Sequence, residues 1–202
     1  MLPLKERIDL LEEDLKSSPP AFAMSVELPF AILRYDPSLP EENEWTVRKE
    51  IQKLATRISN TTGKKVHILS MSEMFWRSIN ESEGIEAIIE LEKERGFLAA
   101  ERQVNAYLDD DQEEQWRTIK SLLIEQTNIL DPKKDIVFLT RATAFAPSSY
   151  RVSALLEKII NKVKVPIVLF YPGTWQTSLN YMGLRSDEEP LGSYRVKIYG
   201  RD

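Results

Sequence analysis

Short apolar runs and amphipathic segments alternate along the chain, and this alternation predicts the fold. Four runs are apolar at nearly every position and have the length of buried strands: residues 30–35, 66–69, 136–140 and 166–171. Apolar residues recur at helical spacing over residues 4–15, 45–59 and 152–163. Strands that are apolar on both faces and are separated by amphipathic helices predict a mostly parallel sheet covered by helices. The expected fold class is therefore α/β, with about four to six strands.

The middle of the chain carries helical patterns and no strand pattern. We expect Ser72 to cap a short helix and residues 82–130 to form a helical insertion on the sheet. Acidic residues at 109–114 stand where the last helix of this block would begin, which favours the positively polarised end of a helix. Residues 194–199 alternate like a half-exposed strand near a sheet edge. The whole chain, residues 1–202, is expected to be one α/β domain.

Composition limits the chemistry that the chain can perform. The 202 residues are 42% hydrophobic and 29% charged, which is ordinary for a globular protein. The chain has no cysteine and one histidine, so the usual zinc, copper and non-haem iron sites lack their nitrogen and sulfur ligands. That histidine, His67, lies inside a predicted strand and is expected to be packed and hydrogen-bonded. We found neither a signal-peptide pattern nor an apolar run long enough to span a membrane, and the expected compartment is the cytoplasm.

Sequence motifs for nucleotide binding or hydrolysis are missing. The sequence contains no G-x-x-x-x-G-K-[ST], no G-x-G-x-x-G after a strand and no G-x-S-x-G. Asp36 is the one acid placed directly after a predicted strand, and Asp36-Pro37 is also an ordinary turn signal. We therefore expect no catalytic, cofactor or metal site and a protein that is not an enzyme. The alternatives are a magnesium-dependent nuclease or phosphatase centred on Asp36 and a nucleic-acid-binding accessory module. A net charge of −5 does not favour direct binding of nucleic acid.

Arginine and aromatic residues gather near the predicted strand ends, which lie along one edge of a parallel sheet. These residue types are enriched in protein interfaces because they combine a large contact area with a polar group. Arg141 and Arg151 have an alternative role, in which they pair with carboxylates inside the fold. The apolar face of the first helix is a second candidate surface. The candidate partner-binding residues are Ile8, Arg34, Tyr35, Arg141, Arg151, Tyr171 and Trp175.

Four stretches of the chain resemble the BrxB family of BREX bacteriophage exclusion systems. The first is PIVLFYPG at residues 166–173, a strand ending in Y-P-G. The others are RYDP at 34–37, VFLTR at 137–141 followed by Pro147 and Leu155-Leu156, and YRV at 194–196. Their order and spacing are also similar to the family pattern. The chain departs from that pattern after Pro172-Gly173, where Thr174 and Trp175 replace an acid and a tyrosine.

This resemblance implies a small core subunit of a system that methylates host DNA and blocks unmodified phage DNA. It also implies partners among the other BREX subunits. These are a PglZ-like protein of the alkaline-phosphatase superfamily first, then a BrxC-like ATPase and a PglX-like methyltransferase. The missing catalytic motifs fit an adaptor that binds and organises such subunits.

Overall fold

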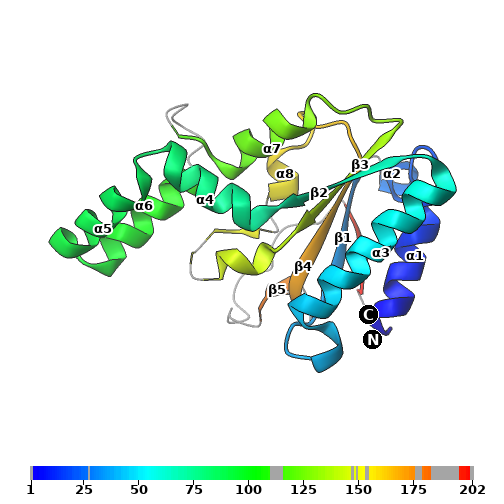
Figure 1. Cartoon of the computed structure of the whole chain (residues 1–202), viewed down its shortest axis with the longest axis horizontal. Helices are drawn as coiled ribbons and strands as arrows, with labels where there is room; N and C mark the ends of the chain where they lie inside the picture. The colour runs from blue at the N-terminus through cyan, green and yellow to red at the C-terminus, as the bar shows by residue number, and fades with distance from the viewer. Residues whose placement is uncertain are drawn as a thin grey trace.

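A mostly parallel sheet with helices on both faces forms the body of the molecule (Figure 1). The computed structural model describes residues 2–26, 28–109, 116–146, 148, 150–152, 155–175, 179–182 and 196–200. Parallel neighbours lie in the order β2-β3-β4-β1-β6, and β5 pairs antiparallel with β4. The strands are β1 (Phe30–Tyr35), β2 (Lys65–Ser70), β3 (Asp135–Thr140), β4 (Ile167–Trp175), β5 (Leu179–Tyr181) and β6 (Lys197–Tyr199). The predicted α/β class and mostly parallel sheet are confirmed.

Each face of the sheet has its own apolar core because successive side chains of a strand point in opposite directions. Ala31 and Leu33 of β1 pack with residues of α1 and α3, whereas Phe30 and Ile32 pack with residues of α4, α7 and α8. The helices of the first face are α1 (Leu4–Lys16), α2 (Ala21–Val26) and α3 (Glu44–Thr62). Those of the second face are α4 (Met71–Glu81), α7 (Ile119–Thr127) and α8 (Leu155–Lys158). Two short 3-10 helices, η1 (Pro40–Glu42) and η2 (Ala142–Phe145), follow β1 and β3.

The predicted helical insertion is present and includes an arm that projects from the sheet (Figure 1). The arm consists of α5 (Gly84–Arg95) and α6 (Phe97–Asp109), which pack against each other as a hairpin. Gly96 joins them with a positive φ of 83°, a conformation that glycine adopts without a steric penalty. Helix α4 connects the arm to the end of β2.

The structure corrects two expected helix boundaries. Helix α4 is capped by Ser70, whose hydroxyl oxygen accepts from the Glu73 amide at 3.3 Å, while Ser72 lies buried inside the helix. A longer helix was expected over residues 152–163, and within the described part of this range α-helix is present only over α8. Asn161 has a φ of 63°, which a continuous α-helix does not allow.

Beyond residue 109, parts of the prediction lie outside the described residues. Helix α7 begins at Ile119, after its cap Thr118, which is later than the acidic residues had indicated. The acidic residues at 110–114, together with Pro147, Tyr194 and Arg195, fall outside the described part of the chain. The part of the last strand that is described, β6, pairs with β1 at the sheet edge as expected.

Strand β4 also differs from its prediction, because it continues through Pro172-Gly173 to Trp175. There it pairs with β5, and the carbonyl oxygen of Pro172 accepts from the Met182 amide at 3.2 Å. A Cβ atom at position 173 would collide with the backbone carbonyl of Asn180, so this close approach of β5 requires glycine.

No helix in the described part of the chain is both long and apolar enough to cross a membrane.

Candidate functional site

A cavity of about 390 Å³ opens at the carboxyl ends of β2 and β3. We call it the α3–β3 cavity. Helix α3 supplies one wall through Trp45, Arg48 and Lys49, and the strand ends supply Ser70 and Arg141. Since Glu73 of α4 also lines it, the cavity lies where a helix from one face of the sheet meets a helix from the other. Ligands of open α/β sheets bind at this edge, outside the carboxyl ends of the strands.

The charged groups of the α3–β3 cavity are predominantly positive. Arg48, Lys49 and Arg141 contribute three cations, and Glu73 contributes one carboxylate. The guanidinium carbon of Arg48 lies 5.9 Å from the centre of the Trp45 ring, and the Lys49 ammonium lies 5.0 Å from it. These distances permit cation–π attraction, which holds the two cations beside the indole. The cavity can therefore accommodate an anionic group.

Arg141 has an unusual backbone conformation at the end of β3. Its φ of 59° and ψ of 35° lie in the left-handed region, which disfavours a side chain with a Cβ atom. Such a conformation costs on the order of 1–3 kcal/mol, and residues held in it cluster at functional sites. Among the seven expected partner-binding residues, Arg141 is the one that lines the α3–β3 cavity.

Arg34 and Tyr35 are used inside the fold. Arg34 is buried, and its guanidinium donates to the carbonyl of Gly200 at 2.9 Å and to that of Gly173 at 3.1 Å. These bonds tie β1 to the ends of its two neighbouring strands. The buried Tyr35 hydroxyl donates to Glu44, and burial raises its pKa above the ordinary tyrosine range, followed by the repulsion of the Glu44 charge. Neither side chain is available at the surface.

The other expected edge residues divide between the interior and the surface. Tyr171 is buried and packs edge-to-face on Tyr181, with ring centres 5.8 Å apart. Trp175 is partly buried, and Arg151 is exposed. Together with Arg141, these two residues are the expected edge residues that reach solvent.

Ile8 lies in the core of the first sheet face and is 2% exposed. It packs in one cluster with Leu11 and Leu15 of the same helix and with Leu54 of α3. The apolar face of α1 is therefore covered within the chain, and Ile8 cannot contact a partner in this arrangement.

The two residues considered for chemistry both have structural partners. Nε2 of His67 lies 2.9 Å from Oδ1 of Asp135, so the expected hydrogen bond is present. Desolvation raises the pKa of Asp135, but the hydrogen bonds from His67 and from the Asp131 amide outweigh it and lower the pKa below its ordinary value. Asp36 accepts from the Ser38 amide at 3.0 Å and its hydroxyl at 2.7 Å, which is a turn. No group of three possible metal ligands occurs among the described side chains.

The arm carries exposed apolar side chains at its tip. Phe97 and Leu98, which follow the turn at Gly96, are 62% and 64% exposed, and Ile89 in the middle of α5 is 44% exposed. We call Phe97 and Leu98 the arm tip. The helical pattern of residues 82–130 did not indicate this exposure, because apolar spacing alone does not show which helical faces are covered.

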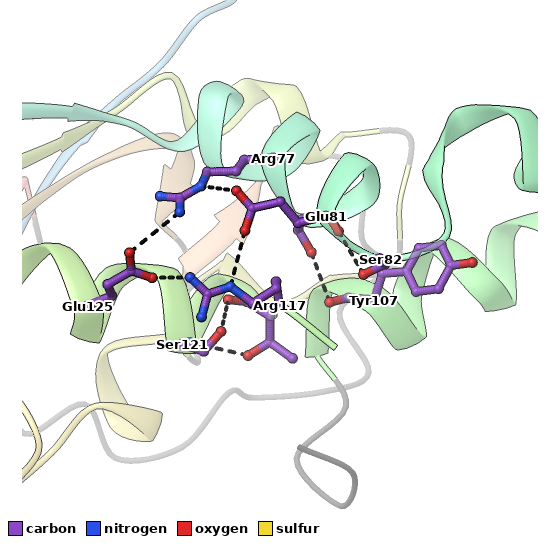
Figure 2. Close-up of polar contacts among 9 residues, drawn as sticks. Arg77, Glu81, Ser82, Tyr107, Arg117, Ser121 and Glu125 are labelled. Carbon is purple, nitrogen blue, oxygen red and sulfur yellow. Dashed lines mark hydrogen bonds and ion pairs between the residues drawn. The ribbon is translucent and has the colours of Figure 1, made fainter. Parts of the chain in front are cut away.

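A ring of charges joins α4, the helix that leads into the arm, to α7 and the residue before its cap (Figure 2). Arg77 and Glu81 of α4 pair with each other, and Arg117 and Glu125 likewise pair across the start of α7. Two further contacts, from Arg77 to Glu125 and from Arg117 to Glu81, close the ring. In the same region, the Ser78 hydroxyl donates to the backbone carbonyl of Tyr107 at 2.9 Å and links α4 to α6.

The fold and these surfaces define an α/β protein with a parallel sheet, a projecting helical arm and a cation-lined cavity at the sheet edge. The sequence model of the family described as BREX protein BrxB matches residues 67–197. The match covers more than half of the chain, which therefore belongs to the BrxB family and is a BREX component. No curated protein and no solved structure matches the chain.

Proposed function

We propose that the chain is a non-catalytic subunit that binds and organises other BREX subunits in the cytoplasm. The first partner is a PglZ-like protein, followed by a BrxC-like ATPase and a PglX-like methyltransferase. The observation that carries this proposal is the arm tip, where the large apolar side chains of Phe97 and Leu98 are exposed directly after the turn of the hairpin. Exposed apolar side chains that gather at one place are typical of interaction sites.

Burial of the arm tip by a partner would stabilise a complex. Covering a large apolar side chain completely contributes about 1.5–3 kcal/mol, and Phe97 and Leu98 each retain a substantial part of that contribution because more than half of each is exposed. The base of the arm is held by a buried apolar cluster of α4, α5 and α6 that includes Ile79, Ile88 and Tyr107, and by the hydrogen bond from Ser78 to Tyr107. An arm that is already positioned loses less conformational entropy on binding, which favours affinity.

The charge of the arm indicates the chemistry of the surface that it contacts. Helix α5 carries four glutamates against one lysine and one arginine. None of the four forms an ion pair with another residue of the described part of the chain: Glu86, Glu90, Glu92, Glu94. A partner surface with an apolar centre and a basic rim would complement this helix, because opposite charges around an apolar contact favour the correct orientation.

Co-purification with a matched control tests the role of the arm tip. The double variant Phe97→Ser/Leu98→Ser should fold and lose most of the co-purified PglZ-like protein. The control is Ile129→Ser, which replaces an apolar side chain that is 86% exposed after α7 and far from the arm along the chain. Retention of the partner by the double variant, or equal loss in the control, would show that the arm tip does not bind it.

The exposed part of the sheet edge is a second docking surface to test. Arg151 and Trp175 reach solvent and do not line the α3–β3 cavity. The double variant Arg151→Glu/Trp175→Ser should weaken co-purification of a BREX subunit if this edge contacts a partner. Full recovery of all partners by this folded variant would remove both residues from the interface.

A further inference from the structure

We propose that the α3–β3 cavity binds a phosphorylated small molecule with a flat ring, of the mononucleotide class. This ligand site is separate from the arm tip, and it does not depend on which BREX subunit the arm binds. Its phosphate would lie among the cavity cations, and its ring would lie against the wall formed by Trp45.

The place and size of the cavity suit a small ligand. Ser70 and Arg141 stand at the carboxyl ends of two neighbouring parallel strands, where open α/β sheets bind their ligands. The volume of about 390 Å³ falls within the range of about 300–1,000 Å³ that is usual for small-molecule sites. Part of a longer ligand would have to extend out of the cavity into solvent.

The side chains of the cavity suit a phosphate. Arg48 and Arg141 each present a planar guanidinium that can donate two parallel hydrogen bonds to phosphate oxygens. No carboxylate of the described residues lies within ion-pair distance of either guanidinium. The Ser70 hydroxyl accepts from the Glu73 amide, which leaves its own O–H able to donate.

Trp45 and Glu73 indicate the remainder of the ligand. The Trp45 side chain is 63% exposed although it is large and apolar, and it lines the cavity beside two cations. Stacking of a base on such an aromatic ring is a common mode of nucleotide binding. Glu73 adds one acceptor, which suits a sugar hydroxyl and not a second phosphate.

A nucleic-acid strand fits these observations less well. Strand binding depends on a charged groove that follows several phosphates. Here three cations gather in one cavity on a chain with a net charge of −5. A free mononucleotide needs only the single phosphate position that these cations supply.

Isothermal titration calorimetry on the full chain tests the proposal with AMP as the probe. Adenosine, inorganic phosphate and an oligothymidylate of about ten nucleotides are the comparison ligands. We expect saturable binding of AMP and binding of adenosine that is at least tenfold weaker, because the phosphate contacts are lost. Since AMP is added to the unaltered chain, this result does not depend on the folding of a variant.

Two variants and one control assign the binding to the cavity. Arg48→Gln/Arg141→Gln should weaken AMP binding at least tenfold, because it removes two charge-assisted contacts. Trp45→Ala should weaken AMP binding about tenfold and leave inorganic phosphate unaffected, because stacking involves only the base. Arg102→Gln, which changes an exposed arginine on α6, should bind AMP like the unaltered chain.

Three results would overturn the proposal. They are no saturable heat with AMP up to about 1 mM, unchanged affinity of the Arg48→Gln/Arg141→Gln variant, and binding of the oligothymidylate without binding of AMP. The third result would assign the cavity to a nucleic-acid strand.

Discussion

The buried ion pair between Arg7 and Glu42 provides the sharpest test of the packing between α1 and the sheet. The side chains of Arg7 and Glu42 are 0% and 3% exposed. Arg7 also donates to the carbonyl of Arg34, and Glu42 accepts from the Asp36 amide at 2.8 Å. Each member of the pair therefore satisfies a backbone group of β1 or of the turn after it.

Removing one charge of this pair should be more harmful than removing both. Arg7→Met or Glu42→Gln leaves the other charge buried without its partner, which costs about 3–5 kcal/mol. The double variant Arg7→Met/Glu42→Gln removes both charges. The side-chain oxygen that remains at position 42 can still accept from the backbone amide of Asp36. What remains is the unsatisfied Arg34 carbonyl, so the expected cost is about 1–3 kcal/mol.

Urea unfolding followed by circular dichroism measures these differences as changes in the free energy of unfolding. Glu50→Gln/Lys53→Gln is the control, since that pair lies on the outer face of α3 and exposed pairs contribute little. If each single variant loses less than about 1 kcal/mol, or if the double variant loses the sum of both, the pair does not stabilise the fold in this way.

Three further predictions concern the fold. Gly173→Ala should lower the free energy of unfolding by at least about 2 kcal/mol, because the new methyl group meets the backbone of β5; an unchanged thermal melting curve would contradict this. Ile8→Asp should lower the free energy of unfolding by more than about 3 kcal/mol in urea unfolding, because the new carboxylate would be buried. Leu10→Asp is the control, since Leu10 of α1 is 51% exposed and its replacement should have little effect. Similar losses in the two variants would be inconsistent with the burial of Ile8. The folded-state pKa of Asp135 is lowered, so its contribution to stability is present above its unfolded pKa and is lost as the pH falls through the folded pKa. The stability advantage over Asp135→Asn should therefore shrink as the pH falls below about 4, and an advantage that grows on acidification would refute the assignment.

The sequence predicts well the elements in which the apolar residues of a short segment are also its buried residues. The observed bounds of β1 match the predicted residues 30–35, because all six side chains of that strand are buried and the first four are wholly apolar. Helix α3 also follows its predicted pattern, extended by a few residues at its carboxyl end to Gly63, where a φ of 71° ends it. Both elements bury side chains at regular intervals along the chain, and this periodicity is visible in the sequence.

The features that the sequence could not predict depend on partners that are distant in the chain. Arg34 is buried in a central strand because carbonyls of Gly173 and Gly200 accept its hydrogen bonds, and no local pattern indicates those partners. Pro172-Gly173 is a turn signal by composition, yet pairing with β5 extends the strand through it. The α3–β3 cavity was missed because Arg48 and Lys49 occupy polar positions on a helix, as solvated residues ordinarily do.

The pairing of β1 has a consequence for synthesis on the ribosome. This strand leaves the exit tunnel early, but its neighbours β4 and β6 lie at residues 167–175 and 197–199. A nascent chain therefore holds an apolar strand with both edges open while the helical arm is being translated. Chaperone engagement during translation, or assembly with a partner before release, would protect that strand from aggregation.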